Sequence, residues 1–397
     1  MLKMPLLLAL ALTFPLLAAT CESNRSAPPA VENGAAGPTA ADGEIIQRRV
    51  ESEEATFRIV RVQSGLTNPW GLEFLSDGRM LVTERAGRMS IVEGGQSTEI
   101  TGLPDVNEHG QGGLLDVRLH PDYDTNGWVY FTFSHQDDGG YGTAIARGRL
   151  DGNTMVDVEI IYSMPNKTNT RQHFGSRITF MNDGTVLFTI GDRGQGDRAQ
   201  DLMDPAGSTI RINDDGSIPQ DNPFIGRSDA LPELYTAGNR NSQGMDIHPQ
   251  TGVVWQTEHG PRGGDELNRI VPGANYGWPV VSEGADYRTR QPIGASHEDR
   301  PEFEAPTLVW TPSIATSGTH FYTGDAFPAW QNNLFVGGLA MEQVRRIVLD
   351  GDQVTHQETL LEGAIGRIRD IRQGPDGFLY LLTDEGDGGI YRLEPVE

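Results

Sequence analysis

One histidine and one aspartate lie at the two outer ends of a predicted β-hairpin. His173 precedes the apolar run 178–180 and Asp192 follows the run 186–190, with the turn dipeptide Asp183-Gly184 between the two runs. Because a hairpin brings its outer ends together, we expect His173 and Asp192 to meet at one rim of a sheet. An imidazole held by a carboxylate is an oriented general base. A histidine that only satisfies its hydrogen bonds at a strand end is the structural alternative.

A second group of residues could bind an anion. Arg367 and Arg369 alternate along one predicted strand and therefore share a face, and Arg240 precedes another strand. Clustered arginines either form internal ion pairs or bind a carboxylate or phosphate. The chain as a whole has a formal net charge of -24, which argues against nucleic acid as a partner.

The glycine-rich segment 258–268 combines carboxylates with uncovered main-chain carbonyls. Its sequence is EHGPRGGDELN, and the segment NYGWP follows at 275–279. Oxygen ligands of this kind suit calcium, and an ordinary loop is the alternative. A zinc site is disfavoured because Cys21 is the only cysteine and no two histidines lie close together on one element.

These residues need a scaffold that brings distant segments together, and the sequence repeats a strand–turn–strand unit. No clear amphipathic helix separates the six copies, which begin near residues 68, 113, 176, 244, 318 and 367. Such repeats are typical of a propeller. We therefore predict an all-β fold, a six-bladed β-propeller of four-stranded antiparallel blades, with five or seven blades as alternatives. Residues that precede the inner strands should converge on the axis at one face, and insertions should enlarge the segments 200–233 and 262–312.

The chain before the predicted propeller domain (57–397) has a different character. Residues 1–20 combine Lys3, an apolar segment and small residues, as in a signal peptide. The residues up to Cys21 resemble a bacterial lipoprotein signal, and we predict that 21–56 is a flexible tether. We expect an exported protein, either lipid-anchored in the cell envelope through Cys21 or free in the periplasm.

Six motifs occur in order along the chain and together carry a family resemblance. They are PWGL at 69–72, QGGL at 111–114, HFGSR at 173–177, RN at 240–241, EHGPRGGDE at 258–266 and RIRD at 367–370. This set resembles the soluble glucose/sorbosone dehydrogenase family, particularly the bacterial aldose sugar dehydrogenases.

The resemblance implies a six-bladed propeller that binds pyrroloquinoline quinone (PQQ) and Ca²⁺ and oxidises an aldose at its anomeric carbon to the lactone. Electrons would pass to an external acceptor. It implies that His173 is the general base and that Asp192 orients it. It also implies that the cofactor is held by Gln111, Arg240, Asn241, Tyr287, Gly338, Leu339, Ala340, Arg367, Ile368 and Arg369.

The same resemblance implies two calcium sites. The carbonyls of Gly260 and Pro261 would ligate the ion beside the quinone, and Glu266 with the carbonyl of Tyr276 would hold a second, structural ion. The chain departs from the family pattern at Ala340, where some relatives carry a lysine that contacts the cofactor.

Two other functions suit a propeller of this kind. A calcium-dependent lactone hydrolase would use His173 to activate water beside the metal. A non-catalytic propeller would bind carbohydrate or protein, with His173 in a structural role. The arginine cluster favours the dehydrogenase, because a neutral lactone does not need it.

Overall fold

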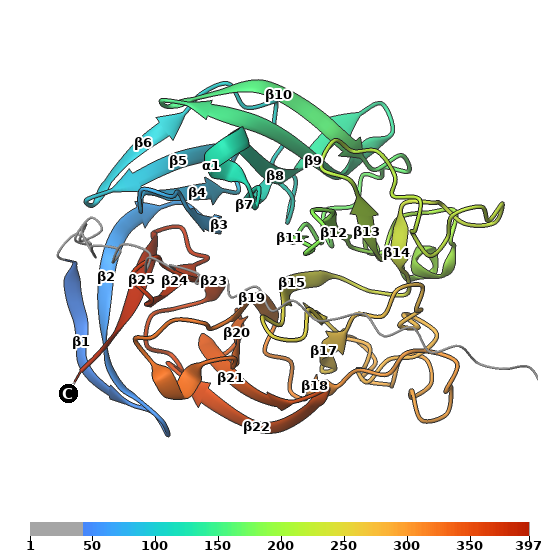
Figure 1. The fold of residues 1–397 in the computed structure, drawn as a ribbon. Coiled ribbons are helices and arrows are strands. Elements are labelled where there is room, and N and C mark those ends of the chain that lie inside the picture. The colour runs from blue at the N-terminus through green and yellow to red at the C-terminus, as the bar shows by residue number, and fades with distance from the viewer. Residues whose placement is uncertain (1–42, 397) are drawn as a thin grey trace, which may run out of the picture. The chain divides into compact units, whose positions relative to one another are not determined.

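The computed structural model describes residues 43–396, which form six antiparallel sheets arranged in a ring (Figure 1). Blade one comprises β3 (Pro69–Phe74), β4 (Met80–Glu84), β5 (Arg88–Glu93) and β6 (Gln96–Ile100). Blade two comprises β7 (Leu114–Leu119), β8 (Trp128–Asp137), β9 (Gly140–Asp151) and β10 (Thr154–Ser163). Blade three comprises β11 (Ile178–Phe180), β12 (Val186–Ile190), β13 (Ser208–Ile212) and β14 (Leu234–Thr236).

The remaining blades complete the ring. Blade four comprises β15 (Ser242–Ile247), β16 (Val254–Glu258), β17 (Asp265–Arg269) and β18 (Leu308–Trp310). Blade five comprises β19 (Thr316–Phe321), β20 (Leu334–Gly338), β21 (Gln343–Asp350) and β22 (Gln353–Leu360). Blade six comprises β23 (Ile368–Gln373), β24 (Leu379–Thr383), β25 (Gly388–Pro395), β2 (Thr56–Leu66) and β1 (Glu44–Glu51). The predicted six-bladed β-propeller is confirmed.

Blade six closes the ring by combining both ends of the described chain. Strand β2 pairs with β25 from the C-terminal end, and β1 adds a fifth strand outside β2. The predicted tether at 21–56 therefore extends too far, because β1 lies inside it. Almost all side chains of β1 are exposed, so this strand is held mainly by backbone pairing and carries no apolar alternation that the sequence could reveal. The predictions for residues 1–42 lie outside the described residues.

The two predicted insertions are partly blade strands. The segment 200–233 contains β13, and 262–312 contains both β17 and β18. The helical elements of residues 43–396 are short: α1 (Tyr123–Asn126) and the 3₁₀ turns η1 (Gly196–Gln200) and η2 (Pro328–Trp330). In the same range no helix has the length and apolar character needed to cross a membrane.

Apolar layers between neighbouring sheets hold the blades together, and the axis is polar. The inner strands β3, β7, β11, β15, β19 and β23 contact one another in sequence around the ring. Near the axis, the fully buried Arg177 donates through Nη1 to Asp116 Oδ1 and Asp370 Oδ1, both at 3.0 Å. Arg372 Nη1 lies 2.9 Å from Asp370 Oδ1. Two arginines therefore match two carboxylates here and join three blades.

Candidate active site

The two ends of the β11–β12 hairpin meet as its turn signal predicted. His173 precedes β11 and Asp192 follows β12, and His173 Nδ1 lies 2.6 Å from Asp192 Oδ1. The main-chain N–H of Gly194 donates to the same oxygen at 2.6 Å, and Trp278 Nε1 donates to Asp192 Oδ2 at 2.7 Å. An ionised carboxylate only accepts, so His173 Nδ1 carries a proton and Nε2 keeps its lone pair in the neutral ring.

The backbone around His173 is fixed by close contacts. His173 has φ +57, in the left-handed region, and its N–H donates to Gln111 Oε1 at 2.8 Å. A Cβ atom on Gly191 would collide with the carbonyl group of His173, so only glycine allows these two segments to approach. Asn241 Oδ1 accepts from the N–H of Gly175 at 3.1 Å, which ties blade four to the same loop.

The environment keeps His173 neutral and Asp192 ionised. Burial lowers the pKa of His173, and the positive charge of Arg240 lowers it further. The hydrogen bond with Asp192 acts in the opposite direction, but the pKa remains below its ordinary value. Burial alone would raise the pKa of Asp192, but the hydrogen bonds from His173 and Gly194 leave it lower than usual. A neutral imidazole bonded to an ionised carboxylate is the resting state that general-base catalysis requires.

A cavity of about 190 Å³ lies where inner strands of several blades begin. Three arginines and one aspartate give it a net positive lining: Arg85, Arg367, Arg369 and Asp384. Its other lining residues are Trp70, Gln111, Leu115, Phe174, Gly175, Asn241, Gln243, His259, Ala315 and Leu339. Burial, followed by the charge of Arg240, lowers the pKa of His259 to about 3, so the positive charge of the lining comes from arginine alone.

The cavity arginines are only partly satisfied by the protein. Arg369 forms an ion pair with Asp384 and donates from Nη1 to Gln243 Oε1 at 3.0 Å, but its buried Nε has no hydrogen-bond partner. Arg367 Nη1 donates to the carbonyl of Leu339 at 3.1 Å. A buried guanidinium with a free donor favours an anionic ligand. The residues present therefore fit a flat polycarboxylate such as PQQ.

Carbonyl oxygens rather than side chains are available for a metal near this cavity. Gly260 O accepts from Arg240 Nη1 at 2.8 Å, and Pro261 O accepts from the Tyr287 hydroxyl at 3.1 Å. Within residues 43–396 no group of three or more His, Cys, Asp or Glu side chains is arranged to hold a metal ion. The carbonyl oxygens of Gly260 and Pro261 are hard ligands, which is the type of ligand that Ca²⁺ prefers.

The residues predicted for the second calcium lie in a separate buried acidic region of blade four. Glu266 is paired with Glu258 across β16 and β17. Burial, and then repulsion from Glu258, raises the pKa of Glu266 well above its usual value. The carbonyl of Tyr276 lies 3.2 Å from His297 Nε2, and the buried Asn268 Oδ1 has no partner. Two neighbouring carboxylates and a free amide oxygen fit a divalent cation.

The structure separates the predicted cofactor residues into two sets. Gln111, Asn241, Leu339, Arg367 and Arg369 line the cavity. Arg240, Tyr287, Gly338, Ala340 and Ile368 do not line it. Arg240 lies beside it through Gly260 and His259. Ile368 packs in the core between blades five and six, and Tyr287 is 61% exposed on a loop.

Several lining or positioning residues were assigned no role from sequence: Trp70, Arg85, Gln243, His259, Trp278, Asp384. Trp70 and His259 lie in two of the six family motifs, and Trp278 lies in the segment NYGWP at 275–279. Arg85 and Asp384 each directly follow the second strand of a blade, β4 and β24. Their position at the end of that strand, beside the start of the inner strand, is the signal that could have identified them.

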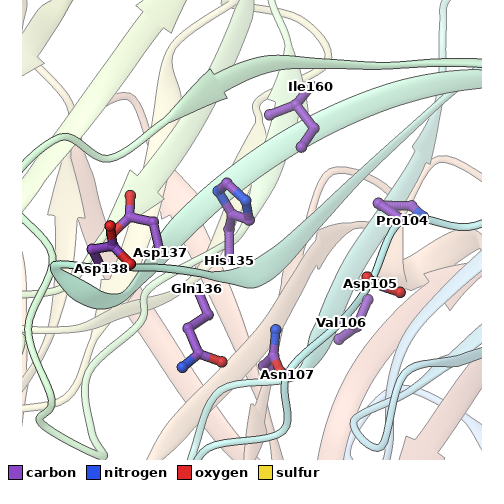
Figure 2. Close-up of a pocket in the computed structure, with 9 residues that line it drawn as sticks. All are labelled: Pro104, Asp105, Val106, Asn107, His135, Gln136, Asp137, Asp138 and Ile160. Carbon is purple, nitrogen blue, oxygen red and sulfur yellow. The ribbon is translucent and has the colours of Figure 1, made fainter.

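A larger depression of about 740 Å³ lies on blade two, away from these residues (Figure 2). It is lined by Pro104, Asp105, Val106, Asn107, His135, Gln136, Asp137, Asp138 and Ile160. The Lys167 ammonium contacts the Asp137 carboxylate and lies 3.2 Å from His135 Nδ1. Because none of the predicted site residues lines this depression, we place the chemistry in the cationic cavity.

Comparison with known proteins agrees with the motif resemblance. The model of the glucose/sorbosone dehydrogenase family matches residues 66–392. The chain is 41% identical over 347 residues to the aldose sugar dehydrogenase YliI of Escherichia coli, covering 86% of this chain and 94% of that protein.

Two solved structures extend this comparison. The apo form of the soluble aldose sugar dehydrogenase from Escherichia coli has a TM-score of 0.83 at 39% identity, covering 86% of this chain and 100% of that one. The PQQ-bound form of aldose sugar dehydrogenase from Streptomyces coelicolor has a TM-score of 0.71 at 29% identity, covering 86% and 98%.

Proposed function

The chain belongs to the glucose/sorbosone dehydrogenase family and is an oxidoreductase that acts on sugars, and we propose that it is a PQQ- and calcium-dependent aldose dehydrogenase. The substrate would be oxidised at its anomeric carbon, and the product would be the lactone. The observation that carries this proposal is the cationic cavity beside a neutral histidine held by an ionised aspartate.

The cofactor would be held by the cavity arginines and amides. Arg367 and Arg369 would bind its carboxylates, because Arg369 has a free buried donor and Asp384 is the only carboxylate among the lining residues. Gln111 and Asn241, whose side-chain oxygens already accept from the loop that carries His173, would bind its polar edge. When bound, PQQ supplies the acceptor for the two electrons that leave the sugar.

The protein's own contribution to the chemistry is proton transfer and orientation. His173 Nε2 would accept the proton of the hydroxyl group on the anomeric carbon, while Nδ1–H stays bonded to Asp192. Asp192 stabilises the imidazolium that results and fixes the reactive tautomer. Because the pKa of His173 is lowered, the base stays unprotonated at pH values somewhat below about 6.5, the ordinary pKa of histidine.

The carbonyls of Gly260 and Pro261 would supply ligands to a calcium ion beside the cofactor. Such an ion acts as a Lewis acid on a carbonyl oxygen. Arg240 donates to the Gly260 carbonyl, and the second lone pair of that oxygen would be available to the ion. Glu266 and the Tyr276 carbonyl would hold a second ion, which would offset the repulsion between Glu266 and Glu258.

The test is dye reduction by purified apoprotein with glucose and other aldoses, before and after addition of PQQ and Ca²⁺. We expect activity only when both are present, and removal of Ca²⁺ by EDTA should abolish it. Absence of activity with every aldose, together with no change in PQQ absorbance, would reject the proposal. Lactone hydrolysis by the calcium-loaded protein without PQQ would favour the hydrolase, and sugar binding without turnover would favour a binding propeller.

We also propose that the chain is exported and anchored to the cell envelope by a lipid on Cys21. The support is the sequence of the first 21 residues alone. In a bacterial host the wild-type protein should fractionate with membranes, and Cys21→Ala should release it to the periplasm. A wild-type protein that stays in the cytosol contradicts export, and identical fractionation of the two proteins contradicts the anchor.

A further inference from the structure

The Asp192 carboxylate accepts a hydrogen bond from a side chain on a different blade. Oδ1 accepts from His173 Nδ1 and the Gly194 N–H, while Oδ2 accepts from Trp278 Nε1 at 2.7 Å. Asp192 is 1% exposed, so bulk water cannot replace a missing donor. An indole N–H is a donor only, which makes this contact specific for an acceptor oxygen.

The indole is held firmly where it meets Asp192. The main-chain N–H of Trp278 donates to the Gly238 carbonyl at 2.9 Å, and the main-chain carbonyl of Trp278 accepts from Gln200 Nε2 at 2.7 Å. The Arg240 guanidinium lies over the indole ring, 5.4 Å from its centroid. A Cβ atom on Gly196 would lie 3.1 Å from Trp278 Nε1, so glycine leaves the room that the ring needs. Main-chain anchors and a stacked cation therefore orient the donor.

We propose that Trp278 is a positioning residue for proton transfer, which fixes the second oxygen of Asp192 and through it the tautomer and orientation of His173. This inference rests on the proposed role of His173 as the base. In the step itself the substrate proton goes to His173 Nε2, the Nδ1 proton stays on the ring, and Asp192 remains ionised. Trp278 transfers nothing and holds the carboxylate in place.

Removing the indole donor has a defined electrostatic direction. The charged or titratable groups that act on His173 are Asp192, Arg240, Arg193 and His259. Only Asp192 raises the pKa of His173. Without the Trp278 donor, Asp192 keeps more of its negative charge toward His173, so the pKa of His173 should rise.

The experiment compares Trp278→Phe with Trp255→Phe. Trp255 is a buried tryptophan of strand β16 whose Nε1 has no hydrogen-bond partner, so its replacement removes an indole without removing a hydrogen bond. Histidine resonances of the apoproteins are followed by NMR against pH, with His173 assigned from His173→Gln. We expect the titration midpoint of His173 to rise by about 0.5 pH unit or more in Trp278→Phe, because the lost hydrogen bond acts on His173 indirectly, through Asp192. The midpoint should stay unchanged in Trp255→Phe.

Kinetics of the enzyme loaded with PQQ and Ca²⁺ add a second readout. In Trp278→Phe, kcat should fall roughly 10-fold with KM within about 2-fold, and the acid limb of kcat/KM should move to higher pH. An unchanged His173 midpoint in Trp278→Phe, or an equal shift in Trp255→Phe, overturns the inference. Failure of the proposed function can be told apart from failure of this inference. In the first case the wild-type enzyme would be inactive, while the titrations of the apoproteins could still be measured.

A measurement on the wild type covers the case in which Trp278→Phe does not fold. The Trp278 indole N–H resonance should shift with pH at the same midpoint as His173, because the two groups share one carboxylate. A Trp278 resonance that does not respond at that midpoint overturns the inference.

Discussion

Asp192→Asn tests the coupling between the carboxylate and the base most directly. The carboxylate receives three donors, from His173, Gly194 and Trp278, and an asparagine offers only one acceptor oxygen. With that oxygen toward His173 and Gly194, the amide NH₂ faces the Trp278 N–H, donor against donor. In the flipped orientation the NH₂ faces His173 and favours the tautomer with its proton on Nε2, which cannot accept the substrate proton.

The magnitude follows from what the base contributes. General-base help of roughly 10²–10⁴-fold corresponds to about 3–5 kcal/mol of transition-state stabilisation. We therefore expect kcat to fall about 100-fold or more, and KM and PQQ affinity to stay within about 3-fold, because Asp192 does not line the cofactor cavity.

The assay is steady-state dye reduction with saturating PQQ and Ca²⁺, beside a fluorescence titration of PQQ. The matched control is Asp138→Asn, which makes the same change at an exposed aspartate of the blade-two depression and should leave kcat unchanged. A decrease in kcat of less than about 3-fold in Asp192→Asn, with PQQ bound normally, would refute the assignment of His173 as a base oriented by Asp192.

Three further substitutions remove or add a positive charge at the axis or at the cavity. Arg177→Met should lower the free energy of unfolding by about 3 kcal/mol, because it deprives the buried Asp116 and Asp370 of a shared cation, and an unchanged urea midpoint would contradict this. Arg369→Met should weaken PQQ binding at least about 10-fold in a fluorescence titration, whereas wild-type affinity would remove this arginine from the cofactor site. Ala340→Lys should tighten PQQ binding, since the ammonium would be added beside the cavity residue Leu339, and equal affinity would show that the lysine position is not equivalent in this chain.

Local sequence signals predicted the parts of the fold that local interactions determine. The Asp183-Gly184 turn fixes the pairing of Ile178 with Phe188, and this register carries His173 to Asp192. The same logic applies in every blade, which is why the repeat was enough to predict six blades. Strand β1 escaped prediction because its side chains face solvent and only its backbone is specified by β2.

Contacts between blades were harder to predict than contacts within a hairpin. Trp278 reaches Asp192 across 86 residues of sequence, and its role depends on how the long connection after β17 lies against η1. Such contacts depend on the conformations of insertions, for which the repeat supplies no template.

The balance of charge separates the two roles that the sequence left open for the arginines. Near the axis, Arg177 and Arg372 face Asp116 and Asp370, so each cation has a carboxylate. In the cavity, Arg85 lies 3.4 Å from Glu108 and Arg369 pairs with Asp384, whereas Arg367 forms no ion pair with any of residues 43–396. An arginine that only joined blades would contact a carboxylate of a neighbouring blade, as Arg177 does at the axis. The unpaired Arg367 at the cavity is explained if an anionic cofactor completes the site.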